Sequence, residues 1–304
     1  MHETVEIYRG HDYSRVIDHV GYPNGETKGT GSMLGKTLVS RALLCAALAW
    51  FSGAALAVDG QTLINQSKAL AGDVTAGDAP GFPVTITRSG SFRLSSDLIV
   101  PAGTNGIVIA TNRVTLDLNG FSIVGAGGGN GVTDGEVDRL AIAIRNGSIT
   151  GFQNGIRLGV GAGANSSSEI QQIRAYSNSV AGILDRGSSL ISGNIANGSN
   201  VGISIGDNST VTANTAVRNG FGIGGGGANS TISGNTAALN TFGGIDVGGQ
   251  NLTISGNTAS SNGGNGIVVR CPGNVIGNTA TNNGSTDIFE VGAGCTRTNN
   301  NPSP

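Results

Sequence analysis

The chain has 304 residues and a formal net charge of −2, with only 12% charged residues but 53 glycines. Neither charge sign forms a run, so the sequence lacks the basic footprint of a nucleic-acid-binding protein and the polybasic patch of a membrane-surface protein. Isoleucine and valine recur at fixed spacing in the second half, which excludes a disordered glycine-rich tail, because low-complexity linkers place no apolar residue at a constant phase.

Residues 33–57 have the features of a secretory signal peptide. They carry a positively charged start, an apolar run at 42–51 and the sequence Ala-Leu-Ala at 55–57, which is typical of a cleavage site. The apolar run is too short to serve as a transmembrane anchor. Residues 1–32 are polar and precede this signal, so we expect a non-native or disordered leader, with translation starting at Met33. The mature protein is therefore predicted to be secreted, periplasmic or at the cell surface.

Removal of these segments leaves a chain without histidine or methionine, because all of these residues precede residue 58. Histidine is the commonest metal ligand and the usual acid–base group near neutral pH. A cofactor held by soft or imidazole ligands is therefore not expected.

Residues 58–84 are predicted to cap the N-terminal end of the fold. Within them, Leu63 to Leu70 can form a short amphipathic helix, which the Pro-Gly-Phe-Pro sequence at 80–83 ends. A cap is needed because an open first coil would offer unpaired strand edges to other molecules.

Residues 85–300 are predicted to form a parallel β-helix, followed by a tail at 301–304. Upstream strands belong to wide, irregular coils, whereas from residue 183 a Gly-Ile pair recurs every 20 to 22 residues. This period suits coils of three short strands, which stack equivalent side chains about 4.8 Å apart. A six-residue phase, typical of left-handed helices, is absent. The fold class is therefore an all-β, single-stranded, right-handed parallel β-helix of about ten coils. The predicted inward column comprises Ile183, Ile203, Ile223, Ile245 and Ile267, faced by a second column of Ile191, Val211, Ile232, Ile254 and Val275.

An asparagine follows each of these repeats at a constant phase. In-register amides can hydrogen-bond along the axis of a stack, and each such bond stabilises by roughly 1 kcal/mol. The ordinary use of asparagine in turns is the alternative explanation. The predicted ladder consists of Asn194, Asn214, Asn235, Asn257 and Asn278.

Several motifs resemble bacterial secreted right-handed parallel β-helix repeat proteins, which share the architecture of the pectate-lyase-like superfamily. They are Asp-Leu-Asn-Gly at 117–120, Gly-Asp-Ala-Pro-Gly-Phe-Pro at 77–83 and the Ser/Thr-x-x-Gly-Asn-Thr-Ala repeats. The resemblance covers nearly all of residues 58–300 and implies the fold. It implies little about activity, because fold analogy alone is a weak guide to function.

The two cysteines left after signal removal are Cys271 and Cys295, in the final coils. In an exported protein such a pair predicts a disulfide that fastens the C-terminal end, and the alternative is two free buried thiols. Closing a loop of this length stabilises a protein by roughly 3 kcal/mol in the chain-entropy model.

The sequence shows no set of residues with catalytic spacing. A glycoside hydrolase needs two carboxylates about 5 to 9.5 Å apart, and the acids of the regular coils do not align in one column. A uronate lyase or epimerase needs a base and a group that neutralises the sugar carboxylate, a role that an arginine with Tyr176 could fill. The candidate residues for a lateral binding face are Arg157, Asp185, Arg186, Asp246 and Arg270.

The loop at 134–138 is a weaker candidate for Ca²⁺, which prefers oxygen ligands. A solvated acidic loop is the alternative. The three carboxylates are Asp134, Glu136 and Asp138.

Two functional hypotheses follow. The first is an exported, non-catalytic β-helix protein that binds extracellular polysaccharide or serves a structural role at the cell surface. The second is a lyase or epimerase that acts on uronate polymers. Neither hypothesis involves nucleic acid, and no feature of the sequence indicates an oligomeric state.

Overall fold

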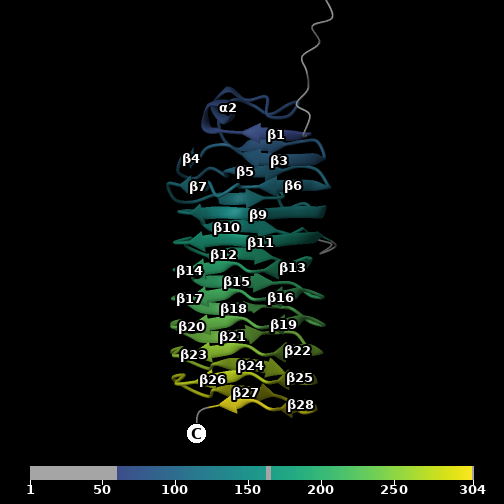
Figure 1. Cartoon of the computed structure of the whole chain (residues 1–304), viewed down its shortest axis with the longest axis vertical. Helices are drawn as coiled ribbons and strands as arrows, with labels where there is room; N and C mark the ends of the chain where they lie inside the picture. Colours follow the sequence, from purple (N-terminus) through teal and green to yellow (C-terminus); the bar gives the residue numbers. More distant parts are fainter. Residues whose placement is uncertain (1–59, 162–165, 303–304) are drawn as a thin grey trace, which may run out of the picture. The chain divides into compact units, whose positions relative to one another are not determined.

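A computed structural model describes residues 60–161 and 166–302, which belong to one compact unit. The predicted leader and signal peptide, residues 1–57, lie outside the described residues. Within those residues the chain forms parallel strands and a single helix, α2 (Gln66–Ala71). The strands of successive coils lie over one another along one axis (Figure 1).

Each coil contributes one strand to a ten-stranded parallel sheet, which we call face 1. Ten such strands confirm a solenoid of about ten coils. Face 1 comprises β2 (Val84–Ile86), β5 (Ile107–Ile109), β8 (Asn130–Thr133), β10 (Asn154–Leu158), β12 (Ala181–Asp185), β15 (Val201–Ile205), β18 (Phe221–Gly225), β21 (Gly243–Val247), β24 (Ile267–Arg270) and β27 (Ile288–Val291).

The other two strands of each coil belong to a 19-stranded sheet that bends around one corner. Face 2 comprises β1 (Gln61–Ile64), β3 (Gly90–Leu94), β6 (Val114–Asp117), β13 (Ser188–Ser192), β16 (Thr210–Thr212), β19 (Thr231–Ser233), β22 (Leu252–Ser255), β25 (Gly273–Ile276) and β28 (Cys295–Thr298). Face 3 comprises β4 (Leu98–Val100), β7 (Ser122–Gly125), β14 (Ile195–Asn197), β17 (Thr215–Val217), β20 (Thr236–Ala238), β23 (Thr258–Ser260), β26 (Thr279–Thr281) and β29 (Asn301–Pro302). Two long strands, β9 (Leu140–Thr150) and β11 (Ser167–Tyr176), run through the corner and serve both faces.

The predicted stack of isoleucines is confirmed, and it extends through all ten coils of face 1. Each member pairs in register with the next, and all are buried, so every coil adds an aliphatic side chain to one continuous core. Burial of such a side chain contributes about 1.5–3 kcal/mol. The column consists of Val84, Ile107, Val132, Ile156, Ile183, Ile203, Ile223, Ile245, Ile267 and Ile288.

The inward column of face 3 changes size along the solenoid. Leu98, Ile123 and Ile149 fill it in the early coils. From Ala175 onward every coil has alanine there, ending at Ala280. Small side chains on one face suit the shorter coils of the second half, because a coil of fewer residues encloses less volume.

The N-terminal cap is fastened to the first coils by side-chain hydrogen bonds. The helix begins at Gln66 rather than Leu63, because Gln61–Ile64 pairs with β3. Asn65 caps the helix by accepting the backbone N–H of Lys68 at 2.8 Å. The buried Asp78 accepts the N–H of Thr85 at 2.6 Å, which ties the cap to β2.

At the other end, Asn301–Pro302 pair with β26. The last coil therefore extends into the segment that was expected to be a tail.

Candidate functional site

The asparagines that follow face 2 form a buried hydrogen-bonded ladder. The Nδ2 of Asn214 donates to the Oδ1 of Asn235 and to the carbonyl oxygen of Ile191, both at 2.9 Å. The backbone N–H of Asn214 also donates to the same Oδ1. Asn194 and Asn257 repeat this arrangement, so the ladder satisfies its own donors and acceptors and leaves nothing to bind a ligand.

A second ladder, which the sequence analysis missed, follows face 3. Its amides hydrogen-bond in the same way, for example from Asn240 Nδ2 to Asn262 Oδ1 at 2.9 Å. The available signal was a constant offset of five residues from the first ladder. The second ladder consists of Asn219, Asn240, Asn262 and Asn283.

Four of the five predicted lateral residues do point outward on or beside face 1. Arg157 lies on β10, Arg186 follows β12, and Asp246 pairs with Arg270 at 2.8 Å further along the same face. Asp185 does not, because its side chain is fully buried. Strand side chains alternate, so a residue two positions after the inward Ile183 must also point inward. The expectation for Asp185 was therefore wrong.

Arg157 and Arg186 line one recess, which we call the face 1 recess. It has a volume of about 360 Å³ and spans the outer side of β8, β10 and β12. Its lining includes Asn130, Glu136, Asn154, Arg157, Val180 and Arg186.

The two arginines of the recess differ in their partners. Arg157 forms an ion pair with Glu136, whose carboxylate is largely exposed. Arg186 is exposed, and no carboxylate of residues 60–161 or 166–302 forms an ion pair with it. The recess therefore offers one available guanidinium beside one that is already neutralised.

Asn154 lines the recess and has a buried hydrogen-bond acceptor without a partner. Its side chain is only 5% exposed, and its Nδ2 donates to Asn130 Oδ1 at 2.8 Å. The next coil has Ala181 in the same register and so supplies no amide to continue the row. Asn154 Oδ1 consequently has no partner in the described structure. A buried acceptor in this state costs about 1–3 kcal/mol.

Two acids beneath the recess turn away from it. Asp134 accepts the N–H groups of Glu136 and Gly159, the latter at 2.6 Å. Asp185 accepts the N–H of Gly187 at 2.9 Å and the hydroxyl of Ser168. Burial raises the pKa of both carboxyl groups above the ordinary value, because the ionised form loses its hydration.

The acidic loop does not gather its carboxylates. Asp134 points inward to backbone N–H groups, whereas Glu136 points outward to Arg157. Over the described ranges, the one group of three potential metal ligands is Cys271, Glu290 and Cys295. The calcium site at Asp134, Glu136 and Asp138 stays a prediction, and this arrangement of the side chains does not favour it.

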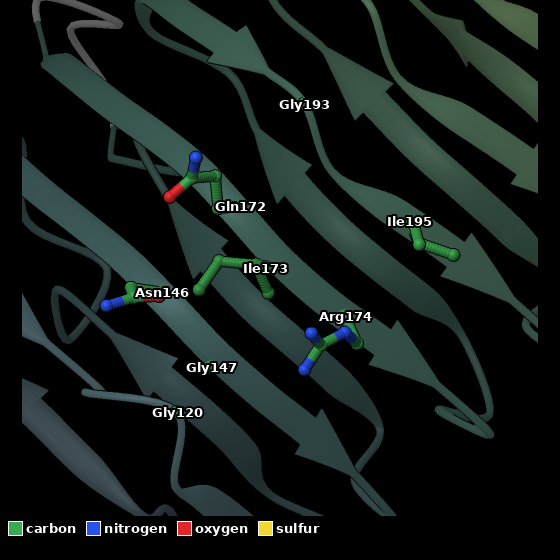
Figure 2. Close-up of a pocket in the computed structure, with 8 residues that line it drawn as sticks. All are labelled: Gly120, Asn146, Gly147, Gln172, Ile173, Arg174, Gly193 and Ile195. Atoms are coloured by element: carbon green, nitrogen blue, oxygen red, sulfur yellow. The ribbon is translucent and has the colours of Figure 1, made fainter.

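A second hollow, which we call the corner cleft, lies where β9 and β11 run through the corner between faces 2 and 3. It has a volume of about 330 Å³ and is lined by Asn146, Gln172, Arg174 and Ile195, among others (Figure 2). Asn146 and Gln172 adopt positive φ angles of 68° and 53°, which glycine favours. Tyr176 lies two residues beyond Arg174, on the same outward side of β11.

The predicted disulfide is confirmed. Cys271 and Cys295 are bonded, with 4.9 Å between their Cα atoms. Cys295 pairs in register with Gly273, two residues after Cys271. The bridge is therefore diagonal between neighbouring coils, which explains a separation slightly longer than the repeat.

Comparisons with known proteins agree with this architecture. Residues 165–302 match the family model described as the right handed beta helix region. Together with the ten stacked coils, this match to the second half of the chain identifies the fold as a right-handed parallel β-helix. No curated protein matches the chain.

Several solved structures share the fold at low identity. A double mutant of the periplasmic alginate epimerase AlgG is 14% identical, with 79% of this chain and 83% of that chain covered and a TM-score of 0.53. A single mutant of the same epimerase is 13% identical over the same shares, with a TM-score of 0.55. The A-module of the Azotobacter vinelandii mannuronan C-5 epimerase AlgE4 is 14% identical over 80% and 84% of the two chains, with a TM-score of 0.48. The similarity to the two AlgG structures, at these identities, establishes the fold alone.

The helical content of the described residues is confined to the short α2. No helix there has the length and hydrophobicity to cross a membrane.

Proposed function

We propose that this protein is an exported, non-catalytic β-helix that binds an acidic polysaccharide, a polymer of uronate sugars, in the face 1 recess. The observation that carries the proposal is the meeting of Arg157, Arg186 and Asn154, whose buried Oδ1 has no partner, in the lining of one hollow. Export is supported by the signal sequence at 33–57, and sequencing the N-terminus of secreted protein tests it.

The groups in the recess complement a uronate. The guanidinium of Arg186 presents several N–H donors in a plane, which suits a carboxylate. A small rotation of the Asn154 side chain toward the recess would let its buried Oδ1 accept a sugar hydroxyl and so remove the energetic cost of the missing partner. Glu136 neutralises Arg157 and repels a second carboxylate, so it limits the affinity.

A non-catalytic role is supported by the state of the nearby acids. Asp134 and Asp185 direct their oxygens to N–H and hydroxyl donors inside the coil, and Glu136 pairs with Arg157. No carboxylate of the described residues is thus free beside the recess to act as a general base.

Calorimetric titration with alginate and with polygalacturonate, against neutral dextran, tests the proposal. We expect binding to both acidic polymers that weakens as salt is added, because exposed charges are screened. Arg186→Gln should weaken binding about tenfold, the effect of losing one charged hydrogen bond. Glu136→Gln should strengthen binding, since it frees Arg157. Arg297→Gln, the same charge change at an arginine paired with Glu290, should leave binding unchanged.

Equal affinity for dextran, or an Arg186→Gln variant that binds like the wild type, would contradict the proposal.

A second candidate function is a uronate lyase or epimerase at the corner cleft. It is favoured by one observation, the exposure of Arg174 and Tyr176 on the same side of β11. In such a reaction the tyrosine oxygen would remove the C5 proton while the arginine neutralised the sugar carboxylate. An ultraviolet assay for unsaturated product and deuterium exchange at C5 distinguish the two functions. Turnover that Tyr176→Phe abolishes would favour the enzyme.

A further inference from the structure

An exposed pair of phenylalanines continues face 1 beyond the recess. The rings of Phe221 and Phe242 lie 5.2 Å apart between centroids, and the residues are 37% and 52% exposed. Gly243 pairs with Phe221 in register, and a Cβ added at Gly243 would lie 3.5 Å from the Phe221 ring, an ordinary contact distance. Exposed aromatic side chains that contact each other across two coils mark a binding surface more often than isolated apolar residues do.

The pair lies in the same register as the unsatisfied acceptor of the recess. Asn154 pairs with Ala181, Ala181 with Val201, and Val201 with Phe221. Three coil steps therefore separate the acceptor from the first ring, which is about 14 Å at about 4.8 Å per step. The two sites are thus placed along one line parallel to the solenoid axis.

The side chains on the surface between the two sites are small and uncharged. Ala181 and Val201 occupy the register line, and the exposed Val180 belongs both to the recess lining and to this surface. A polymer could therefore cross from the recess to the phenylalanines without meeting a bulky or charged side chain on that line. We call the run from Asn154 to Phe242 the face 1 track.

We infer that the face 1 track binds a linear polysaccharide extended along the solenoid, with charged sugar groups at Arg186 and the apolar C–H face of a later sugar on Phe221 and Phe242. This inference rests on the proposed function and adds the length and direction of the ligand. Aromatic rings supply large, rigid contact area at low entropy cost.

A polysaccharide fits the track better than a protein partner does. Stable protein interfaces bury about 800 Å² on each side, whereas the track is a single line of small side chains ending in two rings. Further along face 1, the Asp246–Arg270 ion pair is internally neutralised and adds no net charge. The ligand therefore has its charged contacts at one end and its apolar contacts at the other.

Chain-length dependence tests the inference. Calorimetry would compare a uronate disaccharide, which can occupy only the recess, with an octasaccharide, which can also reach the rings. We expect the wild type to bind the octasaccharide at least about tenfold tighter, since a well-packed ring contact is worth about 1–1.5 kcal/mol. The double variant Phe221→Ala and Phe242→Ala should lower octasaccharide affinity to nearly the disaccharide level and leave disaccharide affinity unchanged.

Phe289→Ala is the matched control, because Phe289 is 44% exposed on face 1 but lies in the last coil. It should change neither affinity. Equal affinity of the wild type for both lengths, or a double variant that keeps the preference for the longer ligand, would overturn the inference while the proposed function stood. Absence of any binding to the wild type would overturn both.

Discussion

The coils before residue 183 and those after it share one core but differ at their corners. In the later coils two asparagine ladders satisfy their own hydrogen bonds, and glycines such as Gly193 and Gly234 turn the corner after face 2. In the earlier coils the corner residues include Asn146 and Gln172, and Asn154 ends a row of amides without a partner. The regular coils thus provide stability, whereas the recess and the corner cleft lie where the irregular coils meet the first regular one.

This difference has a simple physical origin. Identical coils place each polar group opposite a copy of itself, so every donor meets an acceptor. Where coil length changes, the copies are lost and unsatisfied or buried polar groups remain, as with Asn154 and Asp185. Such groups cost free energy in the empty protein, and a bound ligand that supplies the missing partner can offset this cost.

Truncation of a side chain in the shared core should have the largest effect on the free energy of unfolding. Ile223→Ala, in the regular coils, and Ile156→Ala, in the irregular ones, should each lower the free energy of unfolding by about 2–5 kcal/mol. Urea unfolding followed by circular dichroism measures both. Similar losses would support one continuous core, and a loss at only one position would contradict it. Ile195→Ala is the control, because Ile195 is 44% exposed.

Substitution of single asparagines should distinguish the regular coils from the irregular ones more sharply than truncation of the core does. Asn235→Ala removes partners from Asn214, Val211 and Asn257 and should lower the free energy of unfolding by roughly 3 kcal/mol. Asn154→Ala should change it by less than about 1 kcal/mol, because the loss of the hydrogen bond to Asn130 is offset by the removal of a buried acceptor that has no partner. The same variant should weaken uronate binding. If both variants lowered the free energy of unfolding equally, Asn154 would have the same structural role as the ladder asparagines.

Two buried acids, Asp134 in the irregular coils and Asp185 at the start of the regular ones, should give the protein a pH-dependent stability. The pKa of Asp185 is raised in the folded state, so the folded protein holds this proton more tightly than the unfolded chain does. The stabilisation is complete below the unfolded value of about 3.8 and is lost as pH rises through the folded pKa. Asp185→Asn does not titrate, so its melting temperature relative to the wild type should increase as pH rises. Asp134→Asn should show the same trend.

Thermal melts between acidic and neutral pH measure this relative stability. An advantage of Asp185→Asn that is constant or shrinks with rising pH would show that the buried carboxyl is not the cause.

The smallest expected effect concerns the corner after face 2. Ala213 has a φ of 55°, where other regular coils have glycine, so Ala213→Gly should stabilise the protein by about 0.5–1 kcal/mol. Gly234→Ala should destabilise it by a similar amount, since the added carbon would meet nothing closer than 4.0 Å and only the backbone is strained. Differential scanning calorimetry resolves both signs. Gln172→Gly should likewise stabilise the irregular corner while removing a side chain from the corner cleft.

Much of the fold could be predicted because periodic residues report a periodic structure. The spacing of Ile203, Ile223 and Ile245 predicted stacked coils, and the ladder and the disulfide followed from the same register. Asp185 could have been placed inside by strand alternation from Ile183, and the second ladder by its constant offset. The sequence therefore contained enough information to predict both features.

The candidate site depended on contacts between coils of unequal length. Glu136 meets Arg157, and Asn154 faces Ala181, only because intervening loops set how each coil lies on the last. The chain has eight phenylalanines, and only the register between coils shows that the rings of Phe221 and Phe242 lie together. Repetition in the sequence determined the solenoid and its core, because identical coils can stack in only one register. The tertiary structure decided which polar groups lack partners, since that depends on the neighbouring coil and not on the residue itself.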